Sequence, residues 1–264
     1  QGKLAKQDGV ASIKAETVWI DLFEPTVEEE HLVEAALGID VPTRAEMREI
    51  EVSSRLYQEN GAHYMTAFVV HNIDKPRPDS NAFTFILAGN RLVTVRYAEG
   101  KAMGHFLAHV SRGELPADSG AHVLIGLAES VIQQIADLTE RLQDQVDDTA
   151  KGIFDIKGGQ GTRSRRYDVL LKEVGRAGDI VSRAQESARS VERMLNFLKV
   201  VAREQGCDQK LRERVSTAAR DAHALTEHMV FLAERSTFLL DAALGMIAND
   251  QNQIIKLISV MAVA

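Results

Sequence analysis

The stretch from Asp208 to Ala264 constrains the fold more than any other part of the chain. It contains no proline, and only Gly245 interrupts a run of residues compatible with a helix. We therefore expect one continuous helix, which would be roughly 80 Å long at a rise of about 1.5 Å per residue. A helix of this length extends well beyond a small domain, so the rest of the chain should form a body beside it.

The end of this helix has the character of a membrane segment. Residues 254–264 are apolar apart from Lys256 and Ser259, whereas a membrane-crossing helix needs around 20 such residues. We therefore expect the chain to stop inside the first transmembrane helix of a membrane protein. Gln1, in place of a start methionine, predicts that the other end is shortened too.

Composition excludes several classes of function. The net charge of −7 and pI near 5.7 disfavour nucleic acid as a partner and suit divalent cations. Cys207 is the only cysteine, which fits a reducing, cytosolic compartment. The chain contains no Walker-type GKS/T loop, GxGxxG fingerprint after a strand or GxSxG elbow. We therefore expect no enzyme.

The sequence pattern of the first 120 residues predicts an α/β domain. Residues 17–22 alternate as a strand does, and Thr26 with Glu29 forms a capping-box pattern for a helix over 27–37 that Gly38 would end. A second short helix is expected over 44–50, after Pro42. Residues 1–14 carry no clear pattern.

Four strands are expected in two hairpins. Asn60-Gly61 separates residues 53–58 from 63–72, and Gly89-Asn90 separates 83–88 from 91–97. The segment between the hairpins, residues 75–81, contains Pro76 and Pro78 and is expected to be an exposed loop.

Beyond Glu99 the pattern is helical. Helices are predicted over 101–111, 121–156 and 164–205, with Gly158, Gly159 and Gly161 at a hairpin tip and Gly206 ending the last of the three. This divides the chain into an α/β domain (1–120), an antiparallel helical hairpin (121–206) and a long stalk helix (207–264).

The long helix carries a coiled-coil-type seam with 4-3-4-3 spacing. Its members are Ala218, Ala222, Leu225, Met229, Leu232, Ser236, Leu239, Ala243 and Met246. The seam can pack on the protein's own helices or on copies of itself, and the pattern leaves both open. Phe231, Phe238 and Leu240 lie outside the seam, which predicts partners on more than one side.

Candidate metal ligands are weak. The pairs and runs considered are His105 with His109, His223 with His228, the carboxylates Asp144, Asp147 and Asp148, and the glutamates Glu28, Glu29 and Glu30. No third zinc ligand or HExxH context accompanies the first histidine pair, and the second pair is five residues apart. Ordinary surface roles are the better interpretation, with the three glutamates favouring a helix N-terminus.

Three stretches together resemble the CorA magnesium transporter family of the bacterial type. They are WIDLFEPTVEEE, PTRAEMREIEVSSRLY and FLLDAALGMIANDQNQIIK, in that order along nearly the whole chain. The resemblance implies an α+β fold: an N-terminal mixed β-sheet sandwiched by helices, then a helical hairpin and a very long C-terminal stalk helix. It also implies a homopentamer in a bacterial inner membrane, with this part cytoplasmic and a GMN motif and second membrane helix beyond Ala264.

The resemblance also implies where the ion path runs. Asn252 matches an asparagine that faces the pore, and Asp241 matches an acidic position near its cytosolic entrance. Amide oxygens can guide a hydrated magnesium ion, and a carboxylate ring raises the local cation concentration. The pore face would continue through Ile255, Ile258 or Ser259, and Ala262 as a mostly hydrophobic constriction.

The function implied is that of a channel for Mg2+, and also Co2+ or other divalent cations, gated by intracellular magnesium. Two alternatives remain open: a zinc transporter of the same superfamily, and a soluble coiled-coil scaffold without a transport role. Each of the two site residues also has a simpler interpretation. Asn252 can be an ordinary residue on the helix surface, and Asp241 can pair with an arginine.

Overall fold

The computed structural model describes residues 13–73, 75, 77–154 and 160–263, without the side chains of 160–166, 168, 254 and 257–263. Contacts divide the chain into two compact units. Unit 1 comprises residues 1–136 and 186–226, and unit 2 comprises residues 137–185 and 227–264. The predicted three-part division of the chain stays a prediction.

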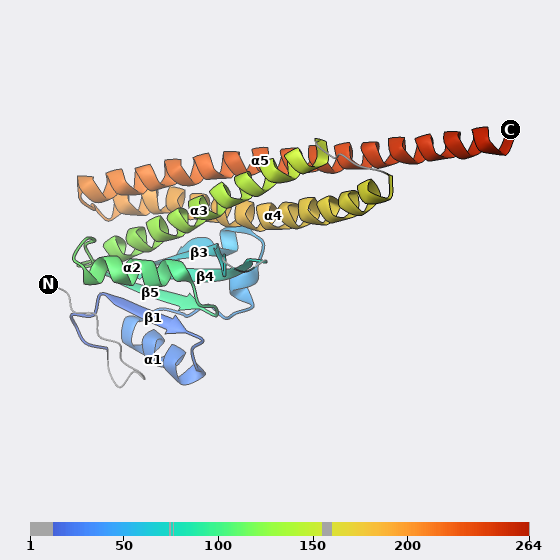
Figure 1. Cartoon of the computed structure of the whole chain (residues 1–264). Helices are drawn as coiled ribbons and strands as arrows, with labels where there is room; N and C mark the ends of the chain where they lie inside the picture. The colour runs from blue at the N-terminus through green and yellow to red at the C-terminus, as the bar shows by residue number, and fades with distance from the viewer. Residues whose placement is uncertain (1–12, 74, 76, 155–159, 264) are drawn as a thin grey trace. The chain divides into compact units, whose positions relative to one another are not determined.

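Unit 1 is built on a five-stranded mixed sheet with the strand order β1-β5-β4-β3-β2 (Figure 1). Strands β2 to β5 form an antiparallel meander, and β1 joins its edge in parallel with β5. The strands are β1 (Trp19–Phe23), β2 (Leu56–Glu59), β3 (Ala62–His71), β4 (Asp79–Ala88) and β5 (Arg91–Arg96). The predicted mixed sheet is confirmed.

Helix α1 (Val27–Leu37) begins and ends where its sequence signals predict. Glu29 donates its backbone N–H to the Thr26 hydroxyl at 3.3 Å, and Thr26 donates its own to the Glu29 carboxylate at 2.9 Å. Gly38 is left-handed, with φ of 67°. The capping box and the glycine C-cap are therefore confirmed.

The helix predicted over 44–50 is wrong in length. Only a 3-10 turn from Glu46 to Arg48 forms there, because the backbone becomes extended at Glu49. The carbonyl oxygen of Glu49 instead accepts a hydrogen bond from Arg55 Nε at 2.5 Å.

Both hairpin turns lie where they were predicted. Asn60 and Gly61 both have positive φ, 48° and 77°, which the twist of a two-residue hairpin requires. The predicted exposed loop over 75–81 is only partly correct, because β4 begins at Asp79 and Pro78 is buried. Strands β3 and β4 pair over ten residues, so this loop is shorter than its prolines suggested.

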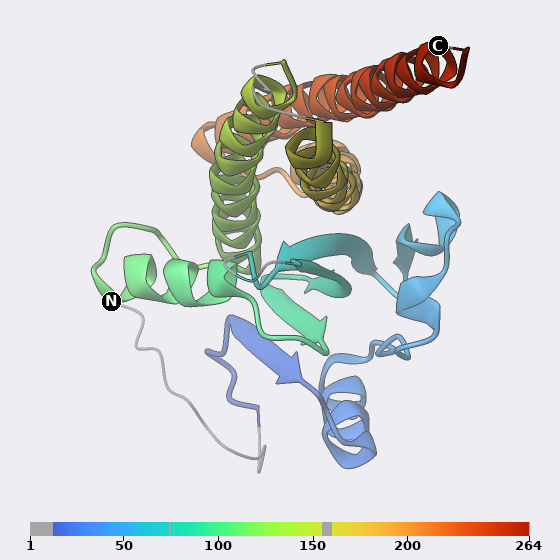
Figure 2. The same cartoon turned by 45° about the vertical axis from the view of Figure 1, so that its right-hand side comes forward.

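Helices cover both faces of the sheet, and Figure 2 shows α1 on one side and the start of α3 (Gly120–Phe154) on the other. On the α1 side, Val33 packs with Tyr64, Ile86 and Val93 in one buried cluster. On the opposite side, the Phe106 ring of α2 (Lys101–Ser111) meets Trp19 edge to face, with centroids 5.7 Å apart. The predicted sandwich is confirmed.

Helix α4 (Gln160–Glu204) covers the edge of β3 that β2 leaves unpaired. Phe68 donates its N–H to Ser190 Oγ at 2.8 Å, and Val70 donates to Ser187 Oγ at 3.1 Å. Ser187 Oγ donates in turn to the Phe68 carbonyl at 2.8 Å. An open strand edge invites association, and these two buried serines satisfy it within the chain.

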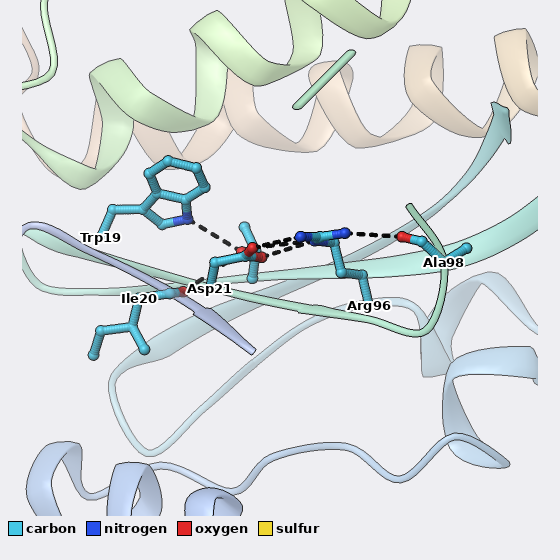
Figure 3. A network of polar contacts seen from close by, with 6 residues as sticks. Trp19, Ile20, Asp21, Arg96 and Ala98 are labelled. Atoms are coloured by element: carbon cyan, nitrogen blue, oxygen red, sulfur yellow. Dashed lines mark hydrogen bonds and ion pairs between the residues drawn. The ribbon is translucent and has the colours of Figure 1, made fainter. Parts of the chain in front are cut away.

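A network of hydrogen bonds links β1 to β5 (Figure 3). Trp19 Nε1 donates to Thr94 Oγ1 at 3.1 Å, and that hydroxyl donates to Asp21 Oδ1 at 2.6 Å. Arg96 Nε and Nη2 grip the Asp21 carboxylate at 3.0 and 2.8 Å, and Arg96 Nη1 reaches the Ala98 carbonyl. In this network the Thr94 hydroxyl both accepts from Trp19 and donates to Asp21, and the Asp21 carboxylate also accepts from Arg96.

We expect Thr94→Val to lower the free energy of unfolding by about 1–3 kcal/mol, because it leaves the Trp19 N–H without its acceptor in a partly buried site. Thr94→Ser keeps the hydroxyl and should restore most of the loss. Urea titration followed by the fluorescence of Trp19 measures both. Equal midpoints for the Val and Ser variants would show that the hydroxyl contributes nothing.

Unit 2 contains the remaining parts of the three long helices. Its core combines Val146 and Ile153 of α3 with Val174 of α4 and Leu239 and Ala243 of α5 (Gln209–Val263). Arg235 Nη2 lies 2.5 Å from Asp147 Oδ1 at the edge of this core. Buried apolar contacts between all three helices therefore hold unit 2 together.

The boundaries of the long helices follow the prediction closely. Helix α3 ends at Phe154 and α4 begins at Gln160, four residues before the predicted start, so Gly161 lies inside a helix. Gly158 and Gly159 lie outside the described residues. Gly206, with φ of 65°, follows the end of α4, and α5 is a single helix of 55 residues as predicted.

Candidate pore face of the long helix

The predicted seam of α5 is the side that packs on the protein's own helices. Seven of its nine members are buried, and Leu225 and Met246 are half-buried. In unit 2, Leu239 and Ala243 contact α3 and α4 in the shared core. The side of α5 that points away from the seam is therefore the side available to line a site.

Asp241 lies on this outward side. It is exposed, although Leu239 and Ala243 on either side of it are buried. Among the residues that the structure describes, its carboxylate has no arginine partner, and the nearby Arg235 is paired with Asp147. The carboxylate is thus accessible to solvent cations.

Asn252 continues the same face. Eleven residues separate it from Asp241, close to three turns, so the two lie within about 20° of each other and roughly 16 Å apart along the helix. Asn252 is exposed, as are Gln251 and Gln253 beside it, and Ile255, one turn further on, is 61% exposed, so helical spacing and not burial defines the face here. A carboxylate, an amide and an apolar side chain therefore follow one another along an exposed stripe.

The remaining predicted pore residues are Ile258, Ser259 and Ala262. Their backbone belongs to α5, and their side chains lie outside the described residues. Helical spacing places Ser259 about 20° from Asn252 and Ile258 about 120° from it. Of the two alternatives at this level, spacing favours Ser259, and the whole assignment stays a prediction.

Exposed apolar side chains accompany the polar stripe. Phe231 and Phe238 are 49% and 60% exposed and Leu244 is 50% exposed, so the predicted further partners of the two phenylalanines stay a prediction. The sequence analysis did not single out Leu244. Leu240, grouped with the two phenylalanines from the sequence, instead packs against the core of unit 2.

Several of the weak metal candidates have ordinary partners. His109 Nδ1 contacts the Glu114 carboxylate, His223 Nδ1 lies 3.0 Å from Glu192 Oε1, and Lys151 pairs with Asp148 at 3.0 Å. Within the described residues, no cluster of three or more His, Cys, Asp or Glu side chains could hold a metal ion. The surface interpretation of these residues agrees with these contacts.

Two polar features in unit 1 had no signal in the sequence. Arg214 of α5 grips Glu129 of α3 with two hydrogen bonds, at 3.1 and 2.6 Å. His63 of β3 is buried, and burial lowers the pKa of its imidazole. Both depend on contacts between segments far apart in the chain, so only the fold brings them together.

Solved structures share the architecture of this chain. The chain resembles the complete CorA magnesium transporter from Methanocaldococcus jannaschii, with a TM-score of 0.74 at 16% identity, covering 98% of this chain and 79% of that one. It also resembles the ZntB cytoplasmic domain from Vibrio parahaemolyticus, with a TM-score of 0.64 at 12% identity, covering 90% and 91%. At these identities the likeness establishes the fold alone.

The family follows from the sequence. The family described as CorA-like Mg2+ transporter protein matches residues 14–264, and this chain belongs to it. The magnesium transport protein CorA of Escherichia coli strain K12 is 30% identical over 247 residues, covering 93% of this chain and 75% of that protein. The CorA protein of Yersinia pseudotuberculosis is 29% identical, covering 99% and 79%. The predicted family is confirmed, and it is a family of transporters.

Among the described residues, no helix contains a stretch long and apolar enough to cross a bilayer.

Proposed function

We propose that this chain is the cytosolic regulatory and stalk part of a homopentameric channel in a bacterial inner membrane, carrying Mg2+ and also Co2+. Membership of the family supports transport of a divalent cation. The observation that carries the proposal is the face of α5 that Asp241, Asn252 and Ile255 share by helical spacing; all three are exposed, and this face lies opposite the seam that is buried up to Ala243. In a ring of five, these stripes can face the central axis.

The chemistry of the stripe suits a hydrated ion. Magnesium gives up its water reluctantly, so a ring of neutral amide oxygens at Asn252 can guide the ion through its hydration shell. A ring of Asp241 carboxylates raises the concentration of cations at the cytosolic entrance. Guidance without direct coordination keeps the ion moving.

The apolar end of the stripe suits a gate. Ile255, followed at helical spacing by Ser259 and Ala262, would narrow the path with mostly hydrophobic groups. A hydrophobic constriction can exclude water and ions without any physical plug. A small tilt of five stalk helices would then switch the pore between wet and dry states.

Magnesium itself is the proposed regulator. Five chains of charge −7 carry −35 formal charges, and closely packed acidic subunits repel one another. Divalent ions between subunits relieve this repulsion, so high magnesium favours a compact closed ring and low magnesium a looser, conducting one.

Limited proteolysis of the full-length pentamer tests this regulation. Millimolar MgCl2 should slow cleavage several-fold compared with a chelator, because bound ions hold the subunits together. NaCl at matched ionic strength is the control and should protect much less. Identical cleavage patterns in MgCl2 and chelator would exclude magnesium sensing.

The two alternatives fare differently. Similarity to the ZntB domain shows a shared fold at 12% identity, so it does not favour zinc as the cargo. A soluble scaffold without a transport role does not agree with membership of a transporter family. Competition between metals in transport assays separates magnesium from zinc.

A further inference from the structure

A groove lies in unit 1 where α4 ends and α5 begins. Its volume is about 500 Å³, and its lining comes from residues 199–203 of α4 and 209–220 of α5. Ala202, which is buried, forms part of the floor. Pockets for small molecules commonly measure about 300–1,000 Å³, so the groove can hold a ligand larger than a single ion.

The lining of this groove is strongly basic in an acidic chain. Its cationic side chains are Lys199, Arg203, Arg212 and Arg220, and Glu213 is its one carboxylate. The lining therefore carries a net charge of +3, whereas the whole chain carries −7. Arg212 and Arg220 lie eight residues apart, about two helical turns, so they share one face of α5.

Nothing in the described part of the chain neutralises these cations with an ion pair. Lys199 Nζ donates to the amide oxygen of Asn196 at 3.2 Å, and Arg220 Nη2 donates to Thr217 Oγ1 at 3.1 Å. The Glu213 carboxylate accepts instead from the neutral Gln209 Nε2 at 2.8 Å. The positive charge of the groove is thus left for an external anion.

The donors are of the kind that recognises phosphate. Arginine presents a planar fork of N–H groups that matches phosphate oxygens, and hydrogen bonds between two charged groups are roughly twice as strong as neutral ones. Ser216 and Thr217 add hydroxyl groups to the lining. The first turn of α5 lies in the same wall, but its Leu211 N–H already donates to the Asp208 carboxylate at 2.7 Å, so the side chains and not the helix end supply the donors.

We propose that this groove binds a small polyphosphate anion, either a nucleoside polyphosphate or an inorganic one. Cations on two helices can contact several phosphates of one chain at once, whereas a single phosphate would occupy only part of the volume. This site is separate from the stripe on the distal half of α5 and does not depend on transport.

Calorimetric titration of the chain with ATP and with tripolyphosphate, in a magnesium-free buffer, tests the site. Both probes should bind at a stoichiometry of one, and affinity should fall as salt rises. Tighter binding of ATP would assign a nucleoside ligand, and equal binding would assign recognition of the phosphate chain alone. Failure of both probes to bind would overturn the proposal and leave the pore proposal untouched.

Variants localise the binding. Arg203→Gln with Arg212→Gln removes two exposed cations of the groove, and we expect affinity to fall at least tenfold. Arg48→Gln with Arg189→Gln removes the same charge from exposed positions outside the lining and should change affinity less than twofold. Equal losses in both double variants would mean non-specific attraction. A changed oligomeric state without polyphosphate binding would assign the groove to a second copy of the chain, and either result would overturn the proposal.

Discussion

Replacing Asn252 by alanine in the full-length protein should reduce magnesium uptake at least tenfold or abolish discrimination between metals. The amide is exposed, and helical spacing places it on the face of Asp241 and Ile255, opposite the seam that is buried up to Ala243. In a pentamer the substitution removes five amides from one level of the path. Losing even one hydrogen bond to a charged species costs about 1.5–3 kcal/mol, which corresponds to tenfold or more.

Uptake into proteoliposomes, followed with a magnesium-sensitive dye and repeated with Co2+ and Zn2+ as competitors, measures this effect. Gln253→Ala is the matched control: it removes the same amide from the next residue, also exposed, about 100° around the helix. It should keep uptake within about twofold of the natural protein. Unchanged uptake and unchanged metal selectivity in Asn252→Ala would remove this residue from the pore.

The competition series also decides the cargo. If zinc enters and magnesium does not, the zinc-transporter alternative holds, whatever the effect of the asparagine. If magnesium enters and cobalt competes with it, the proposed cargo is supported. The two questions are therefore separable in one assay.

Gly120→Ala should destabilise unit 1 by more than about 3 kcal/mol or prevent its folding, because backbone atoms leave no space for a methyl group. A Cβ at this position would lie 2.5 Å from the carbonyl carbon of Arg91 and 2.7 Å from the backbone nitrogen of Leu92. That nitrogen donates to the Val18 carbonyl at 2.8 Å, and Gly120 donates to Asn90 at 2.8 Å. The strand cannot move away without breaking its pairing.

Urea unfolding followed by the fluorescence of Trp19, the chain's only tryptophan, reports on unit 1. Gly104→Ala is the control, because Gly104 is an exposed interior residue of α2 and a Cβ there meets nothing within 4 Å. It should raise stability by up to about 1 kcal/mol through helix propensity. The argument fails if both variants unfold at the midpoint of the natural protein.

The candidate site was predictable in part. The 4-3-4-3 spacing indicated one packing side of α5 but left its partner open, and the family resemblance supplied Asp241 and Asn252, whose role stays a prediction. The basic groove was not predictable, because Arg203 and Arg212 lie on different helices with Gly206 between them. Only the turn at the end of α4 brings their side chains to one surface.

The sequence by itself determined the elements whose signals are local. Thr26 and Glu29 specify the start of α1, Asn60-Gly61 specifies a hairpin, and the absence of proline after Asp208 specifies one long helix. Each signal acts within a few residues, through a cap, a turn conformation or backbone propensity.

Tertiary structure decided how distant segments meet. The parallel pairing of β1 with β5, the cover of the β3 edge by Ser187 and Ser190, and the exposure of Asp241 depend on residues far apart in the chain. A periodic pattern of apolar and polar residues indicates that a helix or strand has two different faces. Only packing against other elements decides which of these faces is covered.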